Sequence, residues 1–256
     1  MHPDLFSIGP LTVHTYGVLI AIGFVTGLVI AIKTGKKYSI DPQRIMDISF
    51  LLIIMGIIGS RIAYILMNLS YYSANPLEIF KIWQGGLVFS GGLLAAIIAA
   101  FFYFKRHRMN ILQMGDIFAP SIAIGQAFGR IGCFMAGCCY GRETCVSWSV
   151  VFTNPDSIAP LYKHLHPTQL YDSLSNIIIF VILMFLSARK KFNGQIFIWF
   201  LIMHSTARLI IERFRGDDRG IFPGTGWTMT QFIAILILLT SIGALYYLKS
   251  KRNEIK

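Results

Sequence analysis

Charged side chains are scarce in this sequence. Asp, Glu, Lys and Arg make up 14% of its 256 residues, whereas 55% of the residues are hydrophobic. A soluble domain of this length carries closer to a quarter charged residues. The apolar residues also gather in blocks as long as a bilayer is thick. The composition therefore excludes an ordinary soluble domain and predicts an integral membrane protein.

Several other features are missing. The N-terminal MHPDLFSIGP lacks the basic region of a cleavable signal peptide. No repeat, low-complexity tract or domain boundary is visible, so a single domain over residues 1–256 is expected. No basic face with interleaved aromatic side chains appears, so the net charge of +11 does not indicate nucleic acid as a partner. The matching inverted halves of many transporters are also lacking.

Seven apolar stretches predict an all-α polytopic fold with seven transmembrane helices. The expected spans are residues 14–33, 45–67, 86–104, 115–136, 170–188, 194–212 and 228–248. Basic residues cluster after the first, third and fifth spans and in the C-terminal tail. Because cytoplasmic loops collect Lys and Arg, we expect the N-terminus outside and the C-terminus in the cytoplasm. This topology accounts for the excess positive charge.

Polar residues nevertheless lie at the outer ends of these spans. They are Arg61, Arg130, His204, Arg208, Glu212 and Arg215. The spacing of four places His204, Arg208 and Glu212 on one helix face. An ionised side chain near the bilayer centre costs about 3 kcal/mol, so such residues usually face a bundle interior or a wet cavity. The set predicts a shared polar cavity that opens outward.

Arginine outnumbers carboxylate in this set, which indicates an anionic ligand. The abundant anion of a bilayer is phospholipid phosphate, and the planar guanidinium donates two parallel hydrogen bonds to it. A structural alternative remains open, in which Arg208 and Glu212 form an ion pair between helices and Arg61 extends to the headgroups.

Glycines accompany these residues. Gly125, Gly129 and Gly132 flank Arg130, and such small residues permit close helix contact or close approach of a ligand. The stretch WQGGLVFSGG, residues 83–92, places two glycine pairs around Ser90. Such a run loosens a helix, which is tolerated at membrane depth where the backbone is buried or lines a cavity.

The four cysteines follow the pattern C-x4-C-C-x5-C at Cys133, Cys138, Cys139 and Cys145. A tetrathiolate zinc site usually has C-x2–4-C pairs, so the pattern gives no prediction of a metal. The outer membrane face is oxidising, and one or two disulfides that fix this loop are the favoured interpretation. Thiols that only pack come next, and a catalytic thiol last. No metal or cofactor is expected.

Six motifs together resemble the bacterial phosphatidylglycerol–prolipoprotein diacylglyceryl transferases. They are HPDLFSIGPLTVHTYG, GSRIAYIL, KIWQGGLVFSGG, GRIGCFMAGCCYGR, HPTQLYD and ARLIIERFR, in chain order over nearly the whole sequence. The resemblance implies transfer of the diacylglyceryl group of phosphatidylglycerol to the lipobox cysteine of a prolipoprotein signal peptide, with release of glycerol phosphate. It also implies the bacterial cytoplasmic (inner) membrane and seven spans.

The resemblance implies roles for particular residues. Arg130 matches the arginine that holds the lipid phosphate, and Arg208, Glu212 and Arg215 match an essential cluster on the sixth span. The remaining matches, expected to bind substrate, are Tyr16, Gly141, His166 and Gln169. Arg61 and Ser90 are expected at the same substrate site.

The sequence departs from the family pattern G-R-x-G-N-F-x-N-G-E-x-x-G at several polar positions. Cys133 and Ala136 replace asparagines, and Cys138 replaces the glutamate. Ser90 stands where a histidine is common, and His204 where a tyrosine is usual. Since serine is a poor base, His204, Glu212 or His166 would have to accept the thiol proton if a base is required.

The transferase class includes a relative that uses another acceptor. Two further function classes stay open at this point. The second class is a membrane thiol oxidoreductase that uses the four cysteines, and the third is a transporter or lipid-binding protein without chemistry. Dependence of activity on the arginines would favour the transferase, whereas dependence on the cysteines alone would favour the oxidoreductase.

Overall fold

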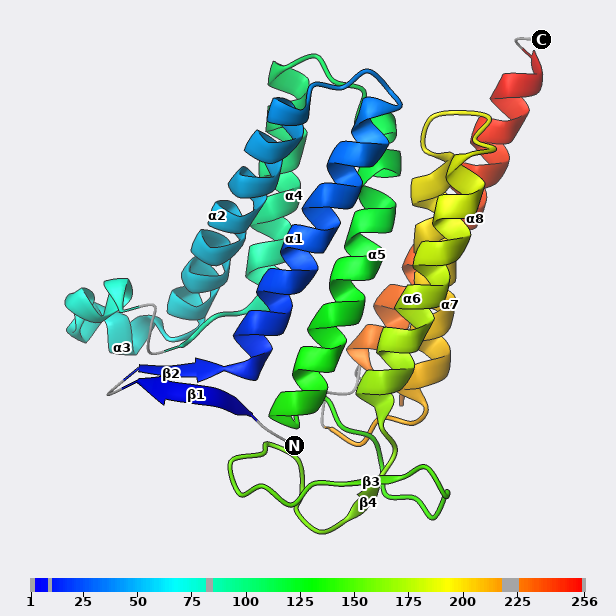
Figure 1. The fold of residues 1–256 in the computed structure, drawn as a ribbon. Coiled ribbons are helices and arrows are strands. Elements are labelled where there is room, and N and C mark those ends of the chain that lie inside the picture. Colours follow the sequence, from blue (N-terminus) through cyan, green and yellow to red (C-terminus); the bar gives the residue numbers. More distant parts are fainter. Residues whose placement is uncertain (1–2, 9–10, 82–84, 218–225, 255–256) are drawn as a thin grey trace. The chain divides into compact units, whose positions relative to one another are not determined.

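The computed structural model describes residues 3–8, 11–81, 85–217 and 226–254 (Figure 1). Its described part contains seven helices long and apolar enough to cross a membrane. They are α1 (Thr15–Lys36), α2 (Pro42–Met67), α4 (Phe89–Arg106), α5 (Ile111–Ala136), α6 (Thr168–Ser187), α7 (Gln195–Glu212) and α8 (Met229–Glu254). The predicted all-α, multi-pass membrane fold is thereby confirmed.

Short elements join these helices. They are the antiparallel pair β1 (Asp4–Ile8) and β2 (Leu11–His14), α3 (Leu69–Ala74), the 3-10 helix η1 (Pro76–Phe80), and the antiparallel pair β3 (Val150–Val151) and β4 (His164–Leu165). The chain divides into two compact units, residues 1–31 with 115–256 (unit 1) and residues 32–114 (unit 2). The single domain predicted from the sequence stays a prediction.

Several predicted span boundaries differ from the helices by a few residues, and the start of the third span has a visible cause. The third span was expected to start at residue 86, but α4 begins at Phe89. Gly85 and Gly86 adopt φ values of +86° and +72°, which a helix does not allow and which glycine tolerates best. The glycine-rich stretch therefore leaves an extended approach to α4, and its residues 83 and 84 lie outside the described residues.

Helix packing in unit 2 depends on the second glycine pair of that stretch. A Cβ placed on Gly91 would lie 2.7 Å from the carbonyl oxygen of Gly59, and one on Gly92 would lie 2.6 Å from that of Gly56. The backbones of α2 and α4 therefore approach closely at these positions, where a side chain on either glycine would overlap the facing backbone.

The core of unit 1 lies between α5, α6 and α7. It is formed by the buried residues Ala119, Ala123, Ile179, Leu183, Ile196 and Phe200. At one end of these helices the fully buried Asp116 accepts backbone hydrogen bonds from Gly194 and Phe197 and pairs with Lys190 at 2.9 Å. This carboxylate ties the start of α5 to the connection between α6 and α7.

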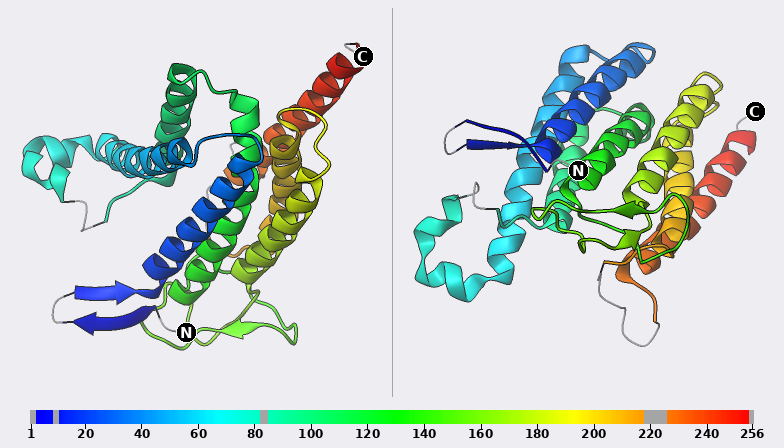
Figure 2. Two further views of the ribbon diagram at one scale, coloured as in Figure 1. Left: turned by 45° about the horizontal axis from the view of Figure 1, so that its top comes forward. Right: turned by 60° about the horizontal axis from the view of Figure 1, so that its bottom comes forward.

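Against α5 lies α1, which runs beside it in Figures 1 and 2. A Cβ on Gly23 would lie 3.1 Å from the carbonyl oxygen of Gly125, and one on Gly132 would lie 3.0 Å from the Tyr16 ring. The glycines next to Arg130 thus serve close helix contact, one of the two roles predicted for them.

The connection between α5 and α6, residues 137–167, covers one end of these helices (Figure 2). It has a small core of its own, made of Phe152, Ala159 and Leu165. Its start is anchored by α6, where Thr168 donates to the carbonyl oxygen of Cys139 and Gln169 to that of Cys138. A bridge between Gly141 and Arg215 also joins this first part of the connection to the residues after α7.

Candidate active site

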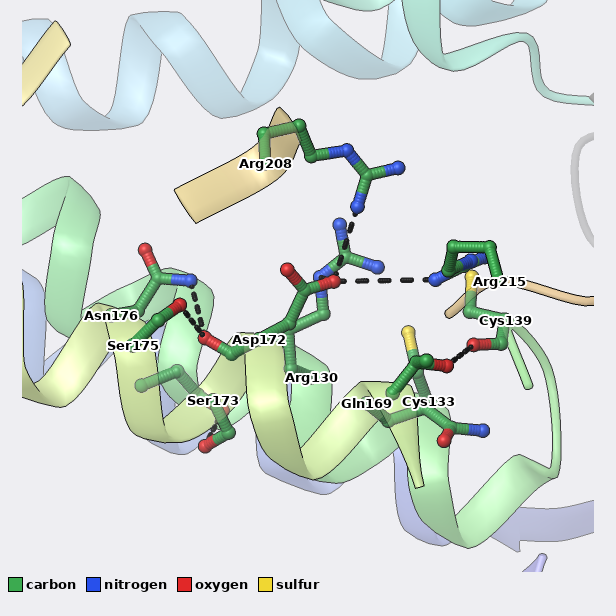
Figure 3. A network of polar contacts seen from close by, with 12 residues as sticks. Arg130, Cys133, Cys139, Gln169, Asp172, Ser173, Ser175, Asn176, Arg208 and Arg215 are labelled. Carbon is green, nitrogen blue, oxygen red and sulfur yellow. Dashed lines mark hydrogen bonds and ion pairs between the residues drawn. The ribbon is translucent and has the colours of Figure 1, made fainter. Parts of the chain in front are cut away.

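Three arginines from two helices and the segment after α7 converge on one carboxylate. Asp172, on the second turn of α6, has its Oδ2 atom 3.3 Å from Nε of Arg130, 3.2 Å from Nη1 of Arg208 and 4.0 Å from Nη1 of Arg215 (Figure 3). The Asp172 side chain is only 5% exposed. The three arginines predicted at the outer ends of the spans are therefore brought together, around a residue that the sequence interpretation did not include.

Asp172 belongs to a polar face that was visible in the sequence. The buried side chains of α6 include Thr168, Gln169, Asp172, Ser173 and Asn176, which recur at intervals of three and four residues in an apolar helix. This is the spacing of one helix face. The rule that selected the intramembrane arginines applies equally to Asp172, and it would have found this carboxylate.

The charge balance differs from the expected excess of arginine. Besides Asp172, Glu212 lies 3.0 Å from Nη2 of Arg208, and Asp217 binds Arg215 through two hydrogen bonds of 2.8 and 2.6 Å. Three carboxylates thus accompany three guanidinium groups. The excess of arginine over carboxylate that was expected at this site is therefore wrong.

Arg130 differs from the other two arginines in its exposure and in the hydrogen-bond donors that it can still offer. Its side chain is 26% exposed, against 9% for Arg208 and 3% for Arg215. Within the described residues its Nε atom pairs with Asp172, and no ion pair or hydrogen bond is formed by its two terminal amino groups. Of the three, Arg130 is therefore the one that presents donors to a ligand.

Glu212 is held on both sides. Its Oε2 atom pairs with Arg208, and its Oε1 atom accepts a hydrogen bond of 3.0 Å from the Thr228 hydroxyl at the start of α8. The side chain is 1% exposed. These contacts favour a role in positioning Arg208 over the proton transfer that was also considered for Glu212.

His204 lies one turn before Arg208 on α7. Its ring stacks on Phe200, with 5.4 Å between the ring centroids, and its electrostatic neighbours are Asp172, Arg208 and Arg130. Of the three predicted base candidates, His204 is the one placed among the arginines without a hydrogen bond from its ring to another described residue.

His166 lies at the end of the long connection, before α6. Its Nδ1 atom is 3.2 Å from the Tyr171 hydroxyl, and its ring packs edge-on against Phe214. Burial, with the charge of Arg142, lowers the pKa of His166. The His166 ring therefore packs between α6 and the residues after α7.

Two predicted substrate-binding residues have structural contacts within the protein. Gln169 is fully buried, and its amide holds the Cys138 carbonyl oxygen at 2.8 Å. Gly141 donates its backbone N–H to His166, and an added Cβ would lie 2.5 Å from the His166 carbonyl oxygen and 2.8 Å from that of Phe214. These contacts fix the loop beside Arg215, and direct substrate binding by the two residues stays a prediction.

Tyr16, in contrast, stays accessible. It is 43% exposed at the start of α1, and its electrostatic neighbours include Cys133 and Arg130. It is therefore an accessible side chain in the neighbourhood of Arg130, and its substrate-binding role stays a prediction.

The other two predicted site residues belong to unit 2. Arg61 is buried, and its guanidinium donates to the carbonyl oxygens of Glu78, Ile79, Gly85 and Gly86 at 2.6 to 3.3 Å. These bonds hold the connection before α4, and the substrate-binding role of Arg61 stays a prediction. Ser90 is exposed in the first turn of α4, and its role at the site stays a prediction.

The cysteines also differ from the favoured interpretation. All four lie in the described part of the chain, and none forms a disulfide. Instead, the sulfur atoms of Cys133, Cys138 and Cys139 lie within 4.8 Å of one another, whereas Cys145 is exposed and outside this group. The predicted disulfides are therefore not how this loop is fixed; Thr168 and Gln169 fix it.

Electrostatics distinguish the two adjacent thiols. Hydrogen bonds with Cys133 and Cys138, and then with the Arg215 guanidinium, lower the pKa of Cys139. Hydrogen bonds with Cys133 and Cys139 raise the pKa of Cys138. Burial acts to lower the pKa of Arg215, but hydrogen bonds to Asp217 and Cys139 outweigh it and keep that pKa above its usual value. Arg215 thus connects the thiols with the arginine cluster.

Comparison with known proteins extends over nearly the whole chain. The family model described as "Prolipoprotein diacylglyceryl transferase" matches residues 3–247. A phosphatidylglycerol–prolipoprotein diacylglyceryl transferase of Clostridium tetani is 35% identical over 242 residues, which cover 94% of this chain and 96% of the relative. Relatives of the same description from Finegoldia magna and Legionella pneumophila are 35% and 34% identical, over 98% and 94% of this chain and 96% and 95% of their own lengths.

Proposed function

Because the chain belongs to the prolipoprotein diacylglyceryl transferase family, we propose that it transfers the diacylglyceryl group of phosphatidylglycerol to the lipobox cysteine of prolipoproteins. The reaction would take place in the bacterial cytoplasmic (inner) membrane, at the outward end of the helices. The thiol sulfur of the cysteine forms a bond to the glycerol carbon of the diacylglyceryl group. The bond between that same carbon and the phosphate oxygen breaks, and glycerol phosphate leaves with both electrons of the broken bond.

The convergence of Arg130, Arg208 and Arg215 on one carboxylate is the observation that carries this proposal. Negative charge grows on the departing phosphate, and donors held in place before the reaction stabilise that charge most effectively in a low-dielectric site. Arg130 has the terminal donors and the exposure to bind the phosphate. Asp172 supports this binding because its carboxylate keeps the three positively charged arginines close together before a lipid is bound.

The acceptor must lose a proton, since the thiolate is the nucleophile and a free thiol has a pKa of about 8.5. The three guanidinium groups favour the thiolate of an incoming cysteine. His204, next to Arg208 on the same helix face, is the base that the contacts favour, because the carboxylate of Glu212 is already bound on both sides. The thiol proton would then pass to a ring nitrogen of His204.

A matched pair of arginine variants tests this assignment. The purified protein in phosphatidylglycerol vesicles, supplied with a lipobox peptide, should yield a peptide that is heavier by one diacylglyceryl group. Arg130→Ala should lower the rate by about 100-fold or more, since losing one such donor costs that much. Arg213→Ala is the control, because Arg213 is exposed directly after α7 and has no ion pair with a described residue.

Complementation of a strain depleted of its own transferase provides the cellular test. The wild-type chain and Arg213→Ala should restore growth, whereas Arg130→Ala and Arg208→Ala should not. Rescue by both of the latter variants would remove the arginine cluster from the reaction. Activity that survives Arg130→Ala and disappears with the cysteines would instead support the thiol oxidoreductase.

A further inference from the structure

Three thiols that are separated in sequence share one small volume. Cys133 lies in the last turn of α5, and Cys138 and Cys139 lie in the loop that follows. Their three sulfur atoms are within 4.8 Å of one another, and all three residues are half-buried (Figure 3 shows Cys133 and Cys139). The spacing C-x4-C-C does not predict such a group, because the chain has to fold back on the helix to form it.

The backbone that folds this loop back is unusual. Gly137 has a φ of +74° and Cys139 a φ of +63°, and a left-handed conformation is uncommon outside glycine. The loop is then fastened to α6, because Thr168 and Gln169 bind the carbonyl oxygens of Cys139 and Cys138 at 2.9 and 2.8 Å. The thiols are therefore held in their arrangement by neighbours other than themselves.

We propose that Cys133, Cys138 and Cys139 form a three-thiolate binding site for a thiophilic metal ion of the class of Zn²⁺ or Cu⁺. Bonds of about 2.3 Å from zinc to sulfur require sulfur atoms about 3.8–4.0 Å apart in tetrahedral or trigonal geometry. The three sulfur atoms lie within 4.8 Å of one another, so each pair has to approach by about 1 Å or less to bind such an ion. Thiolate sulfur selects soft cations and disfavours Mg²⁺ and Ca²⁺.

The charge at this position suits such an ion. Binding converts three thiols to thiolates and releases their three protons to the solvent. With Zn²⁺ the site then carries one net negative charge, and the Arg215 guanidinium already hydrogen-bonds to Cys139. Outer partners of this kind orient metal ligands. Three protein ligands leave one tetrahedral position, which a water molecule would fill, as in zinc sites that are not closed by the protein.

Direct metal binding tests the proposal independently of any transferase activity. The full-length protein, purified in detergent with a phosphine reductant and stripped of metal, is titrated with Co²⁺ and Zn²⁺. Co²⁺ should bind at one equivalent per chain and show the near-ultraviolet charge-transfer absorption of cobalt–thiolate bonds, and Zn²⁺ should displace it. The control is Cys145→Ser, which removes the exposed cysteine outside the group and should bind as the wild type does.

Each of Cys133→Ser, Cys138→Ser and Cys139→Ser should weaken Zn²⁺ binding by more than about 100-fold, since even the loss of an outer partner costs 10- to 100-fold. Thermal unfolding without metal shows whether each variant is folded, and Zn²⁺ should raise the melting temperature of the wild type and of Cys145→Ser only. A variant that lacks Cys133, Cys138 and Cys139 and still binds Zn²⁺ as tightly as the wild type would overturn the proposal. So would an intact mass that shows two of the three always joined as a disulfide before the reductant is added.

Discussion

Asp172→Asn tests the central electrostatic claim, that one carboxylate holds three guanidinium groups together. Asparagine keeps the size and shape of the side chain and removes its charge. The backbone carbonyl oxygen of Asp172, which accepts hydrogen bonds from Ser175 and Asn176, is not altered. The variant therefore isolates the effect of the carboxylate on Arg130, Arg208 and Arg215.

The three contacts contribute unequally. Arg208 is close, at 3.2 Å, and almost fully buried, so its pairing with Asp172 is little screened by solvent. Arg130 is as close but 26% exposed, and Arg215 is 4.0 Å away and already paired with Asp217. Removing one partner of a buried pair costs about 3–5 kcal/mol. We expect that loss in the free energy of unfolding, most of it from the pair with Arg208.

Denaturant unfolding of the purified protein in a neutral detergent measures this loss, and Asp156→Asn serves as control because Asp156 is exposed in the long connection. Added phosphatidylglycerol should restore part of the stability of Asp172→Asn, since a lipid phosphate supplies the missing negative charge. A double-mutant cycle of Asp172→Asn with Arg208→Ala should give a coupling of about 1–3 kcal/mol. A loss within about 0.5 kcal/mol, the level of an ordinary surface substitution, would refute the reasoning.

Three further outcomes are expected. Arg215→Ala should slow diacylglyceryl transfer by about 100-fold or more, whereas Arg213→Ala should stay within about twofold, the effect of an ordinary surface change; equal rates would contradict the role of the cluster. Gly141→Ala should destabilise the protein by about 1–3 kcal/mol, because its new methyl group overlaps a carbonyl oxygen 2.5 Å away; an unchanged melting temperature would show that the loop yields. The pKa of His166 is lowered from 6.5 by burial and Arg142, so protonation favours the unfolded chain, and stability should fall as the pH drops below about 6.5. His166→Gln should show a flatter fall in urea unfolding between pH 8 and 5.5, and an identical fall would exclude His166 as its source.

The seven spans could be predicted within a few residues because a membrane helix is specified by its own composition and length. One of these offsets is the start of α4, where the glycine pair at 85 and 86 takes positive φ values and delays the helix. Hydropathy averages over such a stretch, and it does not register the backbone angles of individual glycines. The conformational preference of glycine was the available signal.

The candidate site was predicted in part. Arg130, Arg208 and Arg215 were identified as isolated charges in apolar segments, and the structure does bring them together. Asp172 was not predicted, although the spacing of polar residues on α6 indicated a buried polar helix face that includes it. Arg61 was included because it also is a charge within a span, but its donors are used by four carbonyl oxygens of its own unit. An intramembrane arginine by itself does not show whether its partner is a ligand or the backbone.

The sequence by itself determined that this chain is a multi-pass membrane protein of the prolipoprotein diacylglyceryl transferase family and which helix faces carry its polar groups. Those properties follow from local periodicity and from motifs that are read along the chain. The tertiary structure alone decided that Asp172 joins three arginines and that Cys133 meets Cys138 and Cys139. Such meetings depend on how distant helices pack and on left-handed turns between them, and neither the spacing of residues nor their chemistry specifies where two segments will touch.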